Sequence, residues 1–292
     1  MSYRSFDSRQ RPVAFISVSL DSTGASQNTL SRIAERTLLA HTVERVRRAR
    51  RIRAVWVSTS DQLYDDGIAD WCAVAGVSCH RSNASSSLER LLDAARAVSA
   101  TTVVRIPGGC PLMDGDTVDQ VVARFAEGDV DWAFTGPEGG WPQGFVAEVC
   151  PVTLLEAVVE AWQNADAPPA QGSTLMHMLD AKASGLTPGP LIRSRSLAHL
   201  MWAASEADQL TFQRMVFELM RVRSPRFGVD DLERLIDEKP WLEALSAPAP
   251  SPAASQGAEG CPAEIEDAIP LTLTPATCAK VRKDALVAIR RC

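Results

Sequence analysis

Short apolar runs rich in β-branched residues alternate with amphipathic segments over the first half of the chain. The runs have the length and composition of buried strands, which we predict at 13–18, 54–58, 102–106 and 131–134. Between them, apolar residues recur at helical spacing, which predicts helices at 37–50, 63–75, 87–98 and 116–126. Because near-continuous apolar strands alternating with helices are typical of a parallel sheet covered on both faces, the pattern predicts an α/β fold, a three-layer α/β/α sandwich.

The second half of the chain adds one strand and several helices. A strand at 146–150 precedes a helix that begins at Pro151. Further helical patterns lie at 171–185, 209–221 and 229–245. We therefore expect a mixed, mainly parallel sheet followed by a C-terminal helical extension.

The composition changes abruptly at Ser246, where a run rich in Pro, Ala and Ser begins. Such a run is typical of an extended linker. We expect a flexible N-terminus at 1–12, one domain at 13–245, a linker at 246–262 and a tail at 263–292, whose short helix begins near Thr274. Two interpretations of this tail stay open, because it either folds back on its own domain or docks on a partner.

The 292-residue chain is 46% apolar and has a formal net charge of −6, so composition gives no support to a nucleic-acid partner. Its first residues are polar and no apolar stretch approaches the length of a membrane span, which predicts a cytoplasmic protein without a membrane partner. Seven cysteines without a C-x-x-C pair are typical of reduced thiols. Four scattered histidines do not suggest a zinc site.

One basic cluster interrupts this acidic composition: Arg45, Arg47, Arg48, Arg50, Arg51 and Arg53. It lies on the polar side and at the end of a predicted helix, where cations interact favourably with the helix dipole. The position favours a solvated face over a binding patch.

The segment after the first strand, VAFISVSLDSTGASQNTL at 13–30, keeps part of a known phosphate-loop pattern, I-P-A-R-L-G-S-T-R-L-P-G-K-x-L. That pattern is typical of the cytidylyltransferase family that includes spore-coat polysaccharide enzymes and the CMP-Kdo and CMP-acylneuraminate synthetases, and the segment resembles it. The residues retained are Leu20, Ser22, Thr23 and Leu30.

The resemblance continues over most of the chain, from Val13 to about Met220. VVRIPGGCPLMD at 103–114 is similar to the family's V-V-R-I-T-G-D-C-P-L-I-D, and WPQGFVAEV at 141–149 to Y-P-x-G-L-D-V-E-V. LMWAASEADQL at 200–210 is similar to L-R-x-T-V-D-T-P-E-D-L. The resemblance implies a nucleotide-diphospho-sugar transferase-like fold, a nucleotide or sugar ligand and a homodimer.

The family's charged positions carry neutral residues here. Two arginines and a lysine are replaced by Ser19, Gly24 and Asn28, and three acids by Gly109, Val146 and Ser205. Cations and magnesium neutralise the triphosphate of CTP in such an enzyme, and magnesium needs carboxylate ligands. We therefore assign no catalytic residue and no metal ligand, and expect Mg²⁺ only if Asp114, Asp116 or Glu206 substitutes for the lost acids.

The resemblance implies vestigial binding positions at the remaining matched residues. On the nucleotide side these are Leu20, Ser22, Thr23, Asp61, Arg81, Arg105 and Cys110, and on the sugar side Trp141, Gly144 and Glu148. Ser22 and Thr23 also suit a turn, and for Asp61 the sequence favours a helix cap over a nucleotide contact. Arg105 is the best candidate, because a cation within a buried strand needs a partner and strands of this fold end at the ligand crevice.

Three functions stay open. The first is a degenerate cytidylyltransferase-like protein of glycan metabolism that binds or regulates without cytidylyl transfer. The second is an active nucleotidyltransferase with an altered phosphate and metal site. The third is a dimeric scaffold or assembly protein. The simultaneous loss of cations and acids favours the first.

Overall fold

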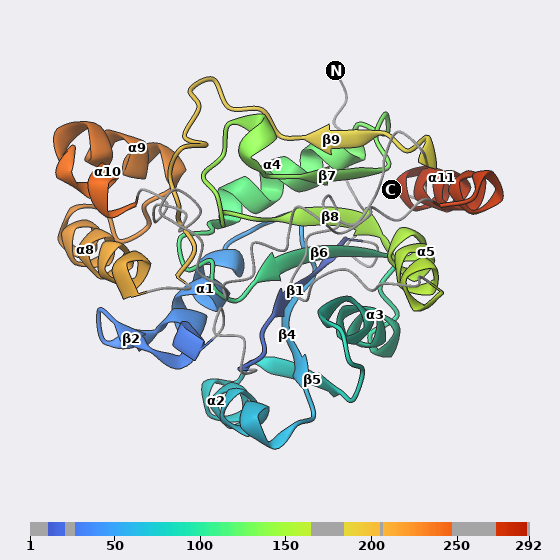
Figure 1. Ribbon diagram of the computed structural model, residues 1–292, viewed down its shortest axis with the longest axis horizontal. Helices are drawn as coiled ribbons and strands as arrows, with labels where there is room; N and C mark the ends of the chain where they lie inside the picture. The colour runs from blue at the N-terminus through green and yellow to red at the C-terminus, as the bar shows by residue number, and fades with distance from the viewer. Residues whose placement is uncertain (1–10, 21–26, 165–183, 205–206, 247–272, 291–292) are drawn as a thin grey trace, which may run out of the picture.

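A central sheet of seven strands organises the computed structural model, which describes residues 11–20, 27–164, 184–204, 207–246 and 273–290 (Figure 1). The strand order is β5-β4-β1-β6-β8-β7-β9. Their bounds are β1 Val13–Ser17, β4 Ala54–Ser60, β5 Ser78–Ser82, β6 Thr102–Pro107, β7 Trp132–Phe134, β8 Glu148–Pro151 and β9 Pro188–Pro190.

The sheet is mixed and mainly parallel, as the sequence predicts. Strands β5, β4, β1 and β6 run parallel. Strand β8 runs antiparallel to β6 and to β7, and β9 pairs parallel with β7. The β6–β8 boundary is therefore where the sheet changes from its parallel half to its mixed half.

Helices cover both faces of the sheet and complete the three layers. Along β1, Val13 and Phe15 point to one hydrophobic cluster while Ala14 and Ile16 point to the other, as the alternation of a strand requires. The first cluster includes residues of two helices, α3 Ser87–Ala97 and α5 Val152–Gln163. The second includes residues of α1 Leu38–Val46, α2 Asp66–Ala75 and α4 Gly115–Ala126.

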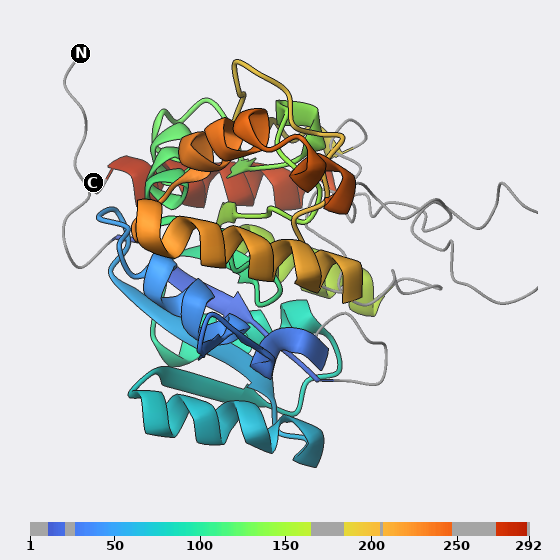
Figure 2. The same ribbon diagram turned by 90° about the vertical axis from the view of Figure 1, so that its left-hand side faces the viewer.

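Three further helices lie beside α1 and form the predicted helical extension (Figures 1 and 2). Helix α8 Ala207–Arg223 corresponds to the helix expected at 209–221. The single helix expected at 229–245 is wrong, because the chain forms α9 Val229–Glu238 and α10 Trp241–Leu245. Pro240 separates them, since proline disfavours helical conformation at the residue before it. The helix predicted at 171–185 lies almost wholly outside the described residues.

Several short elements have no strong signal in the sequence. They are β5, β9, the hairpin of β2 Arg32–Ile33 with β3 Arg36–Thr37, and the 3₁₀ helices η1 Gln27–Leu30, η2 Leu63–Asp65 and η3 Pro137–Gly139. The helix expected at 63–75 consequently begins as η2 and becomes α-helical only at Asp66.

The C-terminal helix α11, Pro275–Arg290, packs on its own domain beside α5 (Figure 1). Leu273, Cys278 and Val281 join the hydrophobic cluster of α3 and α5. The Leu273 amide donates to Ser184 Oγ at 2.8 Å, and Arg282 lies 3.4 Å from a carboxylate oxygen of Asp131. Of the two interpretations of the tail, the structure thus shows the folded-back one. Of the linker expected at 246–262 only Ser246 is described, as the buried C-cap of α10, and of the N-terminus expected at 1–12 only residues 11 and 12 are described.

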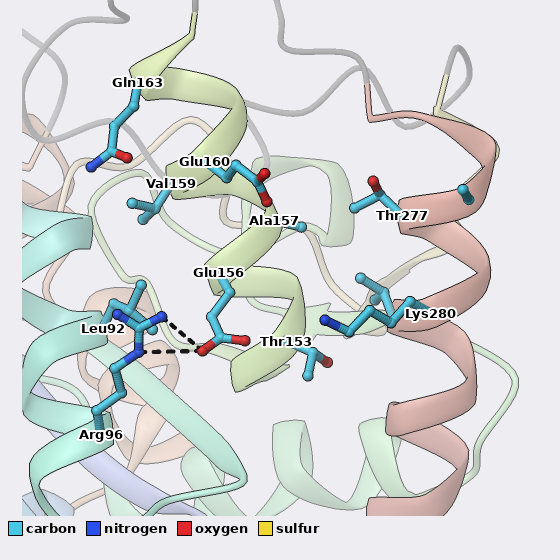
Figure 3. Close-up of a pocket in the computed structure, with 12 residues that line it drawn as sticks. Leu92, Arg96, Thr153, Glu156, Ala157, Val159, Glu160, Gln163, Thr277 and Lys280 are labelled. Atoms are coloured by element: carbon cyan, nitrogen blue, oxygen red, sulfur yellow. Dashed lines mark hydrogen bonds and ion pairs between the residues drawn. The ribbon is translucent and has the colours of Figure 1, made fainter.

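Residues of α3, α5 and α11 line a cavity of about 580 Å³ (Figure 3). An ion pair between Arg96 and Glu156, at 2.9 Å, stands on its α3–α5 side, and Lys280 lies across from it on α11. In the described part of the chain, no helix has both the length and the apolar character that a membrane crossing requires.

The docking of α11 can be tested by removing one buried side chain. We expect Val281→Ala to lower the free energy of unfolding by about 1–2.5 kcal/mol, because it removes two buried methyl groups and leaves a cavity. Urea unfolding measures this loss. The matched control is Lys283→Ala, an exposed position on the same helix, for which we expect a change within about 0.5 kcal/mol. Equal effects of the two variants would contradict the packing described.

Candidate functional site

A buried carboxylate holds the chain immediately after β1, where the resemblance places the phosphate loop. Asp65, in η2, is 0% exposed. One of its oxygens accepts the Leu20 amide at 2.6 Å, and the other accepts Ser19 Oγ at 3.0 Å. The same second oxygen accepts the Ser60 amide at 3.1 Å and the Ser60 hydroxyl. Asp65 therefore ties the end of β1 to the end of β4 through donors that are all neutral.

This arrangement uses groups that a phosphate would need. The Ser19 hydroxyl and the Leu20 amide already donate to Asp65, so they are not available to an anion in this conformation. Residues 17–28 contain no Lys or Arg. The Asp65 carboxylate therefore contacts position 19, where the resemblance calls for a cation.

Three segments that are distant in sequence meet beside this loop. Asn28 Nδ2 donates to the carbonyl of Ala204 at 3.3 Å, and the Ala204 amide donates to the carbonyl of Gly109 at 3.0 Å. Positions 28 and 109, which carry a lysine and an acid in the family pattern, are thus brought together at the carboxyl ends of β1 and β6. Ser205 follows Ala204 but, like Ser22, Thr23 and Gly24, lies outside the described residues.

The residues at this edge do not fit a magnesium ion. Gly109 offers no side-chain oxygen, and its carbonyl already accepts the Ala204 amide. Asp114 caps α4 by accepting the Thr117 amide at 2.7 Å, and its second oxygen accepts the Val229 amide at 3.2 Å. Within the described ranges, no group of three or more His, Cys, Asp or Glu side chains is placed to hold a metal. Magnesium needs oxygen ligands, and among the described residues Gly109 and Asp114 offer no side-chain oxygen that is free of a backbone hydrogen bond.

Arg105 and Glu148 form an ion pair inside the sheet. They are register partners on β6 and β8, their nearest atoms are 2.6 Å apart, and their side chains are 3% and 1% exposed. Among the described residues, Arg105 Nε finds no hydrogen-bond partner. Arg105, which the sequence predicted on the nucleotide side, thus binds Glu148, which the sequence predicted on the sugar side.

The remaining sugar-side candidates belong to a packed aromatic region. The Trp141 indole donates to the carbonyl of Leu191 at 2.6 Å, stacks on Phe145 at a centroid distance of 5.6 Å and lies beneath the Arg193 guanidinium at 4.9 Å. It is buried.

Cys110 and Gly144 join the phosphate side of the sheet to this region. Cys110 Sγ donates to the carbonyl of Gly144 at 2.8 Å, and burial raises the pKa of this thiol to about 11. Gly144 has φ +74°, and a Cβ there would lie 2.5 Å from Cβ of Ala203, so the close approach of the two segments requires glycine.

Asp61 and Arg81 lie near the carboxyl ends of β4 and β5, the two strands at one side of the sheet. Asp61 is exposed, and its carboxylate accepts the side-chain amide of Gln62 rather than capping a helix, so the expected cap is wrong. Arg81 donates to the carbonyls of Ser60 and Gln62 and pairs with Asp66 at 2.7 Å. It stabilises the turn that presents Asp65. Asp65 itself was not singled out in the sequence, although it stands only four residues after Asp61.

Comparison with known proteins agrees with this fold. The family model described as cytidylyltransferase matches residues 13–171, more than half of the chain. The chain belongs to the cytidylyltransferase family. Its fold is also similar to that of a cytidylyltransferase from Leptospira borgpetersenii, with a TM-score of 0.72 at 18% identity over 82% of this chain and 99% of that one.

Two curated relatives of this cytidylyltransferase-family chain match over shorter stretches. It is 25% identical over 153 residues to an uncharacterized protein of Methanocaldococcus jannaschii, covering 52% of this chain and 60% of that protein. It is 36% identical over 107 residues to a 3-deoxy-manno-octulosonate cytidylyltransferase of Anaeromyxobacter sp., covering 36% of this chain and 42% of that enzyme. The chain thus spans less than two thirds of the length of either relative.

The buried ion pair gives a testable consequence. We expect Glu148→Gln to lower the free energy of unfolding by about 3–5 kcal/mol, because it leaves the Arg105 charge buried without its partner. Chemical denaturation measures the loss. The double variant Arg105→Met with Glu148→Leu should recover most of it, since two apolar side chains need no compensation. A single variant as stable as the wild type would show that the pair is not desolvated in solution.

Proposed function

We propose that this cytidylyltransferase-family protein no longer transfers a cytidylyl group from CTP and acts instead as a binding or regulatory partner in glycan or nucleotide-sugar metabolism. The observation that carries the proposal is the Asp65 carboxylate, which takes the Ser19 hydroxyl and the Leu20 amide in a loop without Lys or Arg. We further propose that it acts as a homodimer, as the family resemblance implies, and in the cytoplasm, as the polar N-terminal residues and the lack of a long apolar stretch suggest.

Electrostatics supports the loss of transfer. A triphosphate carries roughly four negative charges, and the displacement at its α-phosphate adds charge that cations and metal must stabilise. Removing a single stabilising group of this kind typically costs about 10²–10³ in rate. Here Ser19 and Asn28 replace cations, and Gly109 replaces a metal-binding acid, so several such losses act together.

The second candidate, an active enzyme with an altered site, requires another acid to take over at the metal position. Asp114 is poorly suited, because both of its oxygens accept backbone amides at the start of α4 and α9. Burial raises the pKa of Asp114, so desolvation disfavours its charged form. Asp116, exposed in the first turn of α4, is the described acid through which this candidate would have to operate.

Binding of CTP measured by calorimetry tests the proposal. We expect weak CTP affinity that changes less than about threefold when Mg²⁺ is added, because Gly109 stands where the family has a metal-binding acid and both oxygens of Asp114 already accept backbone amides. Asp116→Asn should leave the titration unchanged. Magnesium-dependent tightening of tenfold or more, lost in Asp116→Asn, would establish the second candidate instead.

A restored variant provides the positive control. Ser19→Arg, Gly24→Arg, Asn28→Lys, Gly109→Asp and Ser205→Asp together reinstate the family's charges, and position 19 would place its cation beside Asp65. We expect this variant to gain magnesium-dependent CTP binding. If it stays folded by circular dichroism and does not bind, the pocket has changed beyond these positions, and a scaffold role becomes the better account.

A further inference from the structure

A second cavity lies between α1, the β2–β3 hairpin and α8, and none of the residues that line it belongs to the candidate nucleotide site. Its volume is about 310 Å³, at the lower end of the range of small-molecule pockets. Helix α8 lies next to α1 and above the hairpin in the view of Figure 2, and the His41–Phe217 ring contact, at 4.1 Å, joins the two helices. The cavity is therefore formed by α1 and the β2–β3 hairpin on one side and by α8 and the residues that follow it on the other.

The lining of this cavity has an excess of positive charge. Four arginines line it, Arg36, Arg45, Arg48 and Arg221, against two acids, Glu35 and Glu44. Burial lowers the pKa of His41, so that ring adds no charge at neutral pH. The net charge of the lining is thus two positive charges, on a chain whose overall charge is −6.

Arg45 is the fixed part of this site. Its Nε donates to the carbonyl of Met113 at 3.2 Å, and its Nη2 donates to the carbonyls of Leu112 and Phe227, each at 2.9 Å. These acceptors are all neutral, so no directly bound carboxylate cancels the guanidinium charge in these contacts. The Phe227 ring lies 4.1 Å from the guanidinium carbon. Burial lowers the Arg45 pKa to about 10, and the group is still a cation at neutral pH.

The other three arginines are exposed and only partly neutralised. Glu44 pairs with both Arg36 and Arg48, and one carboxylate balances only one of them. Arg221 lies 3.5 Å from Glu218, which is outside the cavity lining. Guanidinium groups bind phosphate and carboxylate oxygens in a fixed fork geometry.

The cavity also has apolar walls. Phe217, Pro225 and Phe227 line it beside the cations. A ligand that suits it has a doubly negative head and an apolar or aromatic body. The larger cavity of Figure 3 differs, because Arg96 and Lys280 are balanced there by Glu156 and Glu160.

We propose that the cavity between α1 and α8 binds a small phosphomonoester, with the phosphate against Arg45, Arg48 and Arg221 and the organic part against Phe217 and Phe227. A phosphomonoester carries close to two negative charges at neutral pH, which matches the two excess positive charges of the residues that line the cavity. The basic cluster that the sequence favoured as a solvated face is thus divided, because Arg47 and Arg50 are exposed outside the cavity whereas Arg45 and Arg48 line it.

Titration of the full-length protein with phenyl phosphate tests this proposal. We expect a dissociation constant on the order of 1 mM or below. The double variant Arg48→Gln with Arg221→Gln should weaken binding at least about tenfold, because it removes two exposed cations from the cavity without disturbing the buried Arg45.

A matched control also removes two positive charges near the ends of α1 and α8, but at arginines that do not line the cavity. Arg47→Gln with Arg223→Gln alters two exposed arginines, one at the C-cap of α1 and one in the last turn of α8. This control should bind phenyl phosphate as the wild type does. No binding by the wild type at about 20 mM, or an equal loss in both double variants, overturns the proposal, since the second result would reflect general charge attraction.

Discussion

Burial of the Asp65 carboxylate is the constraint on which the candidate site depends. A charge removed from water must be compensated by hydrogen bonds or by an opposite charge. Here the compensation comes from Ser19, Leu20 and Ser60, which belong to the ends of β1 and β4. Position 19 carries a short hydroxyl that takes part in this compensation. The Asp65 contacts thus account for one neutral residue at a position where the resemblance calls for an arginine.

Buried charges are also compensated at the β6–β8 boundary. Arg105 and Glu148 satisfy each other where the sheet changes direction, so charges that could have faced a ligand are used within the sheet. Cys110 and Gly144 join the neighbouring loops by a thiol–carbonyl contact, and Ala204 joins Gly109 to Asn28. Among the described residues, these contacts join the matched positions through neutral groups.

The sequence predicted the parts of the fold that have a strong period. The apolar runs of β1, β4 and β6 and the amphipathic α1, α3 and α4 lie where their patterns placed them. Strand β5 reads SCHRS and β9 reads PGP, and neither has the apolar composition of a strand, because their partners in the sheet rather than their side chains define them. Such tertiary pairing cannot be read from local pattern.

The site was harder to predict for a related reason. The matched motifs named positions 28 and 109 but not Ala204, which contacts both, and the partner of Ser19 comes from a turn 46 positions away. The Arg45 guanidinium donates to carbonyls that are 67, 68 and 182 positions away in the sequence. The helical pattern around Arg45 could not show these contacts and indicated only a basic helix face. Contacts of this range leave no periodic signal in the sequence.

Product formation from CTP tests the central claim most directly. The full-length protein is incubated with CTP, Mg²⁺ and either Kdo or an acylneuraminate, and CMP-sugar and pyrophosphate are quantified. The account predicts no product above the enzyme-free reaction, because the loop beside Asp65 and position 109 supply neither cation nor metal ligand. CMP-sugar that accumulates in proportion to protein concentration, with an equal amount of pyrophosphate, would contradict it.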